Sequence, residues 1–394
     1  MAKLTVKDIP LKDKKVIVRV DFNVPIDKKG KITDDTRIKE ALPTIKYILK
    51  SKPKKLILMT HLGRPDGKVI ESLRVDKIAN RLSKLLKQQV KKLDDCIGDE
   101  VKKQIEKTKA KVILLENLRF HPEEEKGDEN FAKELASLAD VYINDAFGTA
   151  HRAHASTTII AKYLPSAIGF LMEKEINSLS CALSPTKPYV IILGGAKVQD
   201  KIGLINNLLD KANSILIGGA MAYTFLKAKG VNVGNSRVEN EKINLAKEIL
   251  DNAQKKNVKI VLPVDHLVVD NIDNPNIKKF TENENIEENL IGVDIGPKTI
   301  SLFKEELKNA NTILWNGPLG IFENDNYAKG TKEIALFLAK LKNAMVIVGG
   351  GDSASAAKKF KVEKKLCHVS TGGGASLEFL EGKTLPGIGI IKEK

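Results

Sequence analysis

The arginines of this sequence are few and unevenly distributed. Only eight of its 65 basic residues are arginines, and seven of the eight lie before residue 153. Where lysine is the usual cation, an arginine indicates a need for the planar donor fork that pairs with carboxylate and phosphate groups. The first half of the chain is therefore predicted to hold an anion site, although ordinary surface salt bridges explain the same arginines equally well.

Polar side chains follow four short apolar runs in this first half. They include Asp21, Asn23, His61, Arg64, Arg119 and Arg152. In open parallel sheets, ligands bind beyond the carboxyl ends of the strands, where such side chains would meet. Their chemistry predicts a small polyanionic metabolite as the ligand of this half.

Glycines occupy the corresponding positions in the second half. Groups of glycines follow apolar runs near residues 194, 218, 317, 349 and 372. Glycine lets backbone N–H groups approach a phosphate, and the N-terminus of a following helix favours the same anion. One such group alone is more simply a tight turn between strand and helix, but five together favour a nucleotide.

Asp352 follows three consecutive glycines and has two interpretations. Its carboxylate either caps the following helix or holds Mg²⁺ on nucleotide phosphates. The same glycines match the Gly-x-Gly-x-x-Ala pattern, so a nicotinamide-dependent dehydrogenase is an alternative function. The acidic residue that would bind the ribose is missing after the next apolar run, which counts against that alternative. The P-loop pattern does not occur in the sequence.

The apolar runs themselves predict strands that are buried on both faces. They are short, continuous and rich in Val, Ile and Leu, as in a parallel sheet covered by helices. The acidic stretch 122–129 is interpreted as a solvated loop leading into a helix. The predicted fold class is α/β, with two doubly wound, mainly parallel, Rossmann-like domains. The predicted strands are 16–20, 56–59, 112–115, 141–143, 190–193, 215–217, 260–262, 313–315, 345–348 and 366–369, and the predicted helices include 75–87, 130–138, 202–211, 242–255 and 327–340.

A proline-flanked helical segment predicts the domain division. Residues 173–187 begin with a helical pattern and end at closely spaced prolines, which is typical of a connector between domains. The first domain is therefore predicted to cover 1–172 and the second 188–379.

The composition excludes several classes of protein. The chain has 394 residues, 42% hydrophobic and 29% charged, which is typical of a globular protein and not of a disordered or coiled-coil one. No apolar stretch reaches the roughly 18 residues of a membrane span, and the first residues lack the apolar core of a signal peptide. The three cysteines are widely spaced and form no Cys-x-x-Cys pair, which predicts neither a disulfide framework nor a thiolate zinc site and fits a reducing, cytoplasmic location. The net charge of +15 leaves a nucleic-acid-binding protein as an alternative, but the lysines are scattered and aromatic residues are only 5%.

Taken together, the strand-end motifs resemble those of phosphoglycerate kinase. One of them reads Arg19-Val20-Asp21-Phe22-Asn23-Val24-Pro25, and the others occur in the order of the family and span nearly the whole chain. They are residues 33–38, 61–65, 116–120, 145–154, 193–202, 294–297, 315–323, 349–353 and 370–375.

The resemblance implies a fold and a reaction. The reaction is reversible phosphoryl transfer between the acyl phosphate of 1,3-bisphosphoglycerate and ADP, giving 3-phosphoglycerate and Mg·ATP. The fold has two similar lobes facing a central cleft, with residues 380–394 returning to the first lobe. Because the two rims divide the substrates between the lobes, we expect hinge bending to bring the reacting groups together. The resemblance also implies a monomer that has no specific nucleic-acid or membrane partner.

The resemblance assigns roles to particular residues. Binding of the glycerate and its phosphates falls to Asp21, Asn23, Arg37, His61, Arg64, Arg119 and Arg152. Nucleotide binding falls to Lys197, Lys201, Gly218, Gly292, Asn316, Glu323, Gly350, Gly351, Asp352 and Ser353, with Asp352 as the Mg²⁺ ligand. The catalytic role, which is contact with the phosphoryl group during its transfer, is assigned to Arg37, Lys201, Gly372, Gly373 and Gly374. No general base is needed, because the nucleophile is already anionic and catalysis rests on positioning and charge.

Overall fold

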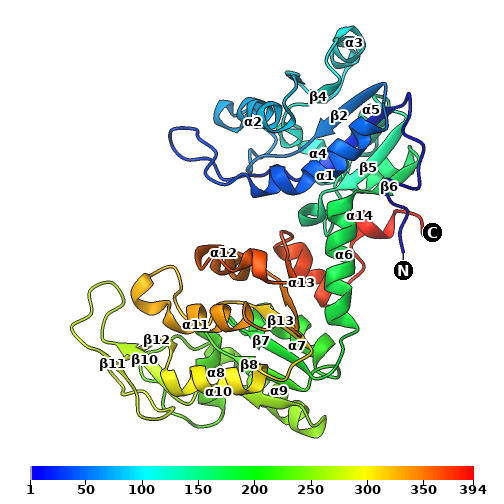
Figure 1. Cartoon of the computed structure of the whole chain (residues 1–394). Coiled ribbons are helices and arrows are strands. Elements are labelled where there is room, and N and C mark those ends of the chain that lie inside the picture. Colours follow the sequence, from blue (N-terminus) through cyan, green and yellow to red (C-terminus); the bar gives the residue numbers. More distant parts are fainter. Residues whose placement is uncertain (1) are drawn as a thin grey trace. The chain divides into compact units, whose positions relative to one another are not determined.

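The chain forms two compact units in its computed structural model, which describes residues 2–394 (Figure 1). Unit 1 runs to Asn177 and also includes Thr384–Lys394, and unit 2 is Ser178–Lys383. The division falls within helix α6 (Phe170–Leu183), so the segment predicted as a connector is largely one helix shared by both units. The predicted boundaries at 172 and 379 lie a few residues before the observed ones.

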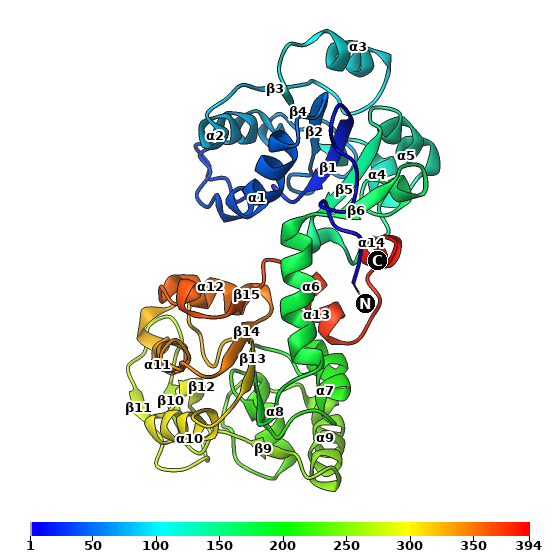
Figure 2. The same ribbon diagram turned by 45° about the vertical axis from the view of Figure 1, so that its right-hand side comes forward.

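Unit 1 is built on a six-stranded sheet in which every strand pairs in parallel with its neighbours. The strands in spatial order are β3 (Val90–Lys92), β4 (Val112–Leu114), β2 (Lys55–Met59), β1 (Lys15–Val20), β5 (Val141–Asp145) and β6 (Ser166–Ile168). The helices are α1 (Thr36–Lys50), α2 (Asp76–Leu86), α3 (Asp99–Lys107), α4 (Pro122–Lys126), α5 (Glu129–Ala136) and α14 (Pro386–Gly389). Helices α1 and α2 lie on one side of the sheet and α4 and α5 on the other (Figure 2).

The two faces of β1 explain why its sequence is a continuous apolar run. Val16, Val18 and Val20 belong to the core formed with α1 and α2. Alternate residues of a strand point to opposite faces, so Ile17 and Arg19 lie on the other face of the sheet. That face is also covered, and all five of these residues are buried. An arginine is thereby built into the interior of unit 1.

Unit 2 repeats the architecture with a second parallel sheet of six strands. Its spatial order is β15 (His368–Val369), β14 (Met345–Val348), β13 (Thr312–Asn316), β7 (Tyr189–Leu193), β8 (Ser214–Ile217) and β9 (Lys259–Val261). A separate antiparallel sheet joins β11 (Lys278–Phe280), β10 (His266–Val269) and β12 (Ile291–Ile295). The helices are α7 (Ile202–Leu208), α8 (Met221–Ala228), α9 (Ile243–Lys255), α10 (Pro297–Leu307), α11 (Lys329–Leu338), α12 (Gly351–Lys359) and α13 (Gly374–Leu380).

The predicted fold class is confirmed, and one local interpretation is wrong. The acidic stretch 122–129 is not a solvated loop, because Pro122–Lys126 forms α4 and Glu124 is completely buried. Proline at the first helical position and glutamates in the first turn both favour a helix start. The strands β3, β6, β10, β11 and β12 were not predicted.

The C-terminal segment belongs to unit 1. The amide of Gly387 in α14 donates a hydrogen bond to the carbonyl of Ala150, and the amide of Leu4 donates one to the carbonyl of Lys392. Both bonds are 2.9 Å long. Across residues 2–394, no helix combines the length and the apolar character that a bilayer span requires.

Candidate active site

Side chains from four neighbouring strands of unit 1 lie beyond the carboxyl ends of those strands. Asp21 follows β1, His61 follows β2, Arg119 follows β4 and Arg152 follows β5. We use the name unit 1 rim for Asp21, Asn23, Arg37, His61, Arg64, Arg119 and Arg152. The predicted anion site therefore maps to one edge of one sheet.

An ion pair fixes the start of α1 to the end of β1. The Arg37 Nη1 atom lies 2.9 Å and 2.8 Å from the two carboxylate oxygens of Asp21. Asp21 also accepts a hydrogen bond from the amide of Asn23, and the Asn23 side chain accepts one from the amide of Gly63. Arg37 remains partly exposed, so its other guanidinium nitrogen atoms can still meet a ligand.

A buried chain of hydrogen bonds lies directly beneath the rim. The Arg19 Nε atom donates to the Ser156 hydroxyl at 2.9 Å, and that hydroxyl donates to Glu124 at 2.6 Å. Glu124 also accepts a hydrogen bond from the amide of Ser156. All three residues are at most 1% exposed, and burial raises the pKa of the Glu124 carboxyl. These hydrogen bonds between Arg19, Ser156 and Glu124 were not predicted, although the scarcity of arginine marked Arg19 as a residue with a specific role.

Arg19 determines which nitrogen of His61 carries a proton. Its Nη2 atom lies 3.1 Å from His61 Nδ1. A guanidinium can only donate, so Nδ1 must accept and the proton of the neutral ring is on Nε2. Burial, followed by the charges of Arg19 and Arg119, holds the pKa of His61 well below its usual value. His61 is therefore a neutral hydrogen-bond donor at neutral pH.

Arg119 retains one donor with no partner. Its Nη1 atom donates to the carbonyl of Gly63 at 2.8 Å, and its Nη2 atom lies 3.1 Å from Glu125. Its Nε atom is buried and has no hydrogen-bond partner. Burial is the main cause of its lowered pKa, with the charges of Arg152 and Arg19 acting in the same direction. Positive charges are crowded here, which suits an anionic ligand.

The remaining rim arginines are more accessible. Arg64 is exposed in the loop after β2, and Arg152 is half-buried. Arg152 lies close enough to Arg119 and His154 to affect both groups electrostatically. Together with burial, these charges lower the pKa of His154 to about 4.

The glycines of unit 2 fall into two groups that serve different purposes. A Cβ atom on Gly194 would lie 2.0 Å from the carbonyl oxygen of Pro318, and one on Gly317 would lie 2.2 Å from that of Gly194. These two glycines allow two backbone segments to approach closely, whereas Gly218 makes room for the side chain of Leu319. By contrast, Gly351 and Gly373 have no atom within 4 Å of a Cβ position, so the backbone there is open to a ligand.

Asn316 connects Lys201 to the turn after β14. The buried Asn316 accepts a hydrogen bond from Lys201 Nζ through its side-chain oxygen and donates one to the carbonyl of Gly349 at 2.8 Å. Burial lowers the pKa of Lys201, and the nearby carboxylates of Asp200 and Asp352 oppose that effect. Ser353 accepts a hydrogen bond from the amide of Gly317 at 2.6 Å.

The first turn of α12 carries the proposed metal ligand. Gly350 precedes the helix with a φ of 92°, and Asp352 is exposed in the first turn. A hard, accessible carboxylate beside open backbone amides suits Mg²⁺, which prefers oxygen ligands and is usually shared with substrate phosphates. We use the name unit 2 rim for Lys201, Asn316, Gly350, Gly351, Asp352 and Ser353.

The other predicted nucleotide residues are spread over unit 2. Lys197 is exposed after β7, and Glu323 is exposed in the loop after β13. Gly292 lies in β12, where a Cβ would meet the hydroxyl of Tyr223 at 2.1 Å. Gly372 and Gly373 precede α13, and Gly374 begins it. The dehydrogenase alternative finds no acidic residue here, because the segment after β15 carries Ser370, bound to Ser376.

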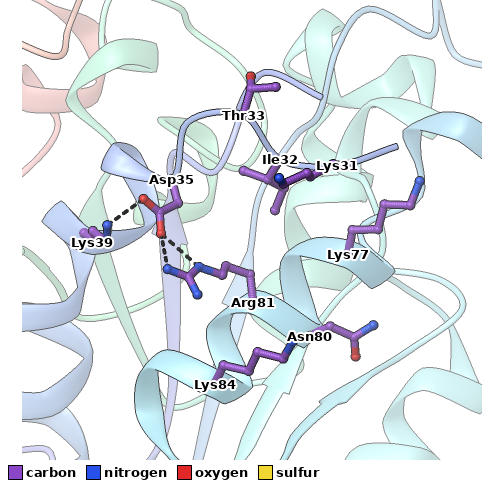
Figure 3. Close-up of a pocket in the computed structure, with 9 residues that line it drawn as sticks. All are labelled: Lys31, Ile32, Thr33, Asp35, Lys39, Lys77, Asn80, Arg81 and Lys84. Carbon is purple, nitrogen blue, oxygen red and sulfur yellow. Dashed lines mark hydrogen bonds and ion pairs between the residues drawn. The ribbon is translucent and has the colours of Figure 1, made fainter. Parts of the chain in front are cut away.

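A basic cavity in unit 1 is lined by none of the predicted site residues. It has a volume of about 530 Å³ and lies between α2, the start of α1 and the segment before α1 (Figure 3). Asp35 is its one carboxylate and pairs with both Arg81 and Lys39. The full lining is Lys31, Ile32, Thr33, Asp35, Lys39, Lys77, Asn80, Arg81 and Lys84.

Comparison with known proteins identifies the family. The family model described as phosphoglycerate kinase matches residues 6–383. Relatives named phosphoglycerate kinase include one from Pseudothermotoga lettingae, 55% identical over 397 residues, with both chains covered completely. Another, from Fervidobacterium nodosum, is 56% identical over 399 residues, covering 100% of this chain and 99% of the relative. The solved phosphoglycerate kinase structure from Coxiella burnetii is 40% identical, covers 98% of each chain and superposes with a TM-score of 0.89. The chain belongs to the phosphoglycerate kinase family.

Proposed function

We propose that this chain catalyses reversible phosphoryl transfer between 1,3-bisphosphoglycerate and ADP, with its two units dividing the substrates. As a member of its family the chain is a phosphotransferase of glycolysis. We assign one substrate to each unit because unit 1 presents fixed cationic side chains, whereas unit 2 presents glycine backbone that is open to a ligand. The unit 1 rim binds the glycerate and the unit 2 rim binds the nucleotide.

The unit 1 rim offers donors that match a phosphorylated carboxylic acid. Neutral His61 donates through Nε2, and the unpartnered Nε of Arg119 is satisfied by an anionic oxygen. Arg64 and Arg152 supply accessible positive charge. Asp21 and Asn23 hold Arg37 and the loop at Gly63 in place through hydrogen bonds.

Lys201 and Arg37 stabilise the phosphoryl group during transfer. The nucleophile is either the carboxylate of 3-phosphoglycerate or a terminal phosphate oxygen of ADP, and neither has a proton to lose near neutral pH. Charge on the transferring group spreads over its three equatorial oxygens. A compact ammonium and a guanidinium fork stabilise that distribution, with further N–H donors from Gly373 and Gly374. The amide of Gly372 already donates to the Ser370 hydroxyl, so its predicted contact with the phosphoryl group would require that bond to break.

Asp352 would hold the Mg²⁺ that accompanies the nucleotide. Bound there, the ion neutralises phosphate charge. The amides of Gly350 and Gly351 and the positive end of α12 act on the same phosphates. Lys197, Gly218, Gly292, Asn316, Glu323 and Ser353 form the remaining nucleotide contacts.

Direct transfer requires the donor and acceptor oxygens to be neighbours. We therefore propose that the two units close around both substrates by hinge bending, which also excludes water from the reactive acyl phosphate. We further propose a cytoplasmic monomer. Three free cysteines, Cys96, Cys181 and Cys367, support a reducing location.

The reaction is tested by following ADP release from Mg·ATP with hydroxylamine present to trap an acyl phosphate as a hydroxamate. We expect ADP release to depend strictly on 3-phosphoglycerate and to match the hydroxamate formed. The Lys201→Ala protein, purified in the same way, controls for contaminating kinases. ADP without hydroxamate, or neither product from folded protein that binds nucleotide, would contradict the proposal.

A further inference from the structure

Three side chains of kinds that bind metal ions converge in unit 1. Asp95 and Cys96 lie in the segment between β3 and α3, and His121 directly precedes α4. One ligand atom from each side chain lies within 4.8 Å of the other two. The two parts of the cluster are distant in the sequence, so the fold brings them together.

The spacing is close to that of a tetrahedral metal centre. Asp95 Oδ1 lies 2.7 Å from His121 Nε2 in a hydrogen bond. Zinc binds Cys, His and Asp at about 2.0–2.3 Å, which places its ligand atoms about 3.3–3.8 Å from one another. Metal binding would therefore widen the contact between Asp95 and His121 by about an ångström or less.

The exposure of the three ligands suits an open site. Cys96 is completely buried, His121 is half-buried and Asp95 is exposed. Sγ would thus bind the ion from the interior, and the exposed side leaves space for water as a fourth ligand. The ring of His121 is held against Phe131, with centroids 5.3 Å apart.

The thiol of Cys96 is neutral in the absence of a metal ion, because burial, followed by the charge of Asp95, raises its pKa. A metal ion must therefore displace the thiol proton. The donor set of one sulfur, one nitrogen and one oxygen favours zinc over magnesium, because magnesium selects oxygen ligands.

We propose that Asp95, Cys96 and His121 form a Zn²⁺ site, separate from the nucleotide metal at Asp352. Binding forms a Zn–S bond and releases the thiol proton of Cys96. The Nε2 proton that His121 donates to Asp95 is released to solvent from a protonated ring, or moves to Nδ1 in a neutral one, and the freed nitrogen and the Asp95 oxygen then bind the ion. No electron transfer takes place. The ion would tie the start of α4 to the segment after β3, and the inference does not depend on the proposed reaction.

Cobalt is the probe that reports on the cysteine, since a Co²⁺–thiolate bond produces charge-transfer absorption in the near ultraviolet. The reduced full-length protein is titrated with Co²⁺ in the absence of nucleotide, and Zn²⁺ is then added. We expect one Co²⁺ per chain with charge-transfer absorption, displaced by Zn²⁺. Absence of that absorption in the wild-type protein would overturn the site.

Variants assign the absorption to this cluster. Cys96→Ser should abolish it, whereas Cys367→Ser, at an exposed cysteine elsewhere, should leave it unchanged. His121→Asn tests a less buried ligand and should weaken Co²⁺ binding at least tenfold, because loss of even an outer partner lowers affinity about 10–100-fold. Unchanged absorption in Cys96→Ser, or unchanged affinity in folded His121→Asn, would each overturn the proposal.

Discussion

The two units use the same sheet architecture to build different binding edges. The unit 1 rim consists of polar and charged side chains, among them the neutral His61 and the cationic Arg119, both at most 5% exposed. The unit 2 rim relies on backbone, with open glycine amides around Gly351. Each edge lies beyond the carboxyl ends of a parallel sheet, so the strand order decides where a ligand binds and the loops decide which ligand it is.

The difference between binding through side chains and binding through backbone also determines which residues are needed beneath each edge. Buried polar side chains must be held in one geometry, and in unit 1 the hydrogen bonds from Glu124 through Ser156 to Arg19 do this for His61. A backbone edge needs its loops to approach closely instead, and in unit 2 Gly194 and Gly317 permit that approach. We call the residues beneath the rims, such as Arg19, Glu124 and Gly317, the supporting layer, and the rim residues themselves the outer layer. Substitutions in the supporting layer should affect stability, and substitutions in the outer layer should affect binding.

Arg19→Ala is expected to have the largest effect. Removing this guanidinium leaves His61 Nδ1 and the Ser156 hydroxyl without their donor and Glu124 without the nearby positive charge. Breaking a buried charge network lowers the free energy of unfolding by about 3–5 kcal/mol. Denaturant unfolding of both proteins measures the loss. Arg64→Ala is the matched control, because Arg64 is exposed and its removal should change stability by about 0.5 kcal/mol or less. Equal losses for the two variants would refute the division into layers.

Asp145→Asn tests a feature that the units share, a buried carboxyl that caps a helix. Asp145 accepts hydrogen bonds from the amides of Leu171 and Met172 in α6, and Asp294 accepts one from Gly330 in α11. Burial raises the pKa of each carboxyl to about 7. The folded protein thus keeps a proton that the unfolded chain, with a pKa near 3.8, releases, and stability falls as the pH rises from about 4 to 7.

The asparagine variant lacks this titration. Its stability relative to wild type should rise by about 2–4 kcal/mol between pH 4 and pH 8, since one pKa unit corresponds to about 1.4 kcal/mol. Asp8→Asn is the control, because hydrogen bonds from Thr5 lower the pKa of Asp8 to about 2 and place its titration below this range. A stability difference for Asp145→Asn that does not change with pH would show that this carboxyl is ionised in the native protein.

Lys201→Ala should reduce turnover about 10²–10³-fold, the loss expected when one electrostatic donor to a transition state is removed. The KM for ATP should change much less, because the contact of Lys201 with the phosphoryl group strengthens during transfer. Lys197→Ala provides a comparison on the same loop, and this exposed residue should affect KM rather than kcat. Steady-state kinetics with both substrates separates the two effects. Parallel losses of binding and turnover in Lys201→Ala would remove its catalytic role.

Gly317→Ala and Gly351→Ala separate supporting glycines from ligand-facing ones. Gly317 has a φ of 104°, and a Cβ there would lie 2.2 Å from the carbonyl oxygen of Gly194. We expect a loss of about 1–3 kcal/mol from backbone strain, before any steric clash is added. Gly351→Ala should leave the melting temperature unchanged and weaken ADP binding measured by calorimetry. A stable Gly317→Ala, or a Gly351→Ala protein with normal ADP affinity, would contradict this distinction.

Continuous apolar runs made all the parallel strands except β3 and β6 predictable. Strands such as β1 and β13 are buried on both faces, and their sequences show it without knowledge of the fold. Among the strands that were missed, β11 is three exposed residues, Lys278–Phe280, and depends on pairing with β10. Sequence alone shows no such long-range pairing.

The supporting layer of unit 1 could not be predicted for a similar reason. Glu124 lies in an acidic stretch that appears fully solvated in the sequence, yet the fold turns this one side chain toward Ser156. Outer-layer residues such as Asp21 and Asp352 stand directly after apolar runs or glycines, so their positions follow from the chain order. Their roles in binding remain predictions.

Arg64→Ala should have the smallest effect and gives the sharpest test of which unit binds the glycerate. The side chain is exposed, so its loss leaves stability unchanged and removes one charged contact. We expect the KM for 3-phosphoglycerate to rise about tenfold or somewhat more, the loss typical of one hydrogen bond to a charged group. The KM for ATP should stay constant, and Arg64→Lys should restore only part of the affinity because lysine lacks the bidentate fork. A change confined to ATP would place the nucleotide on the unit 1 rim and reverse the comparison between the two units.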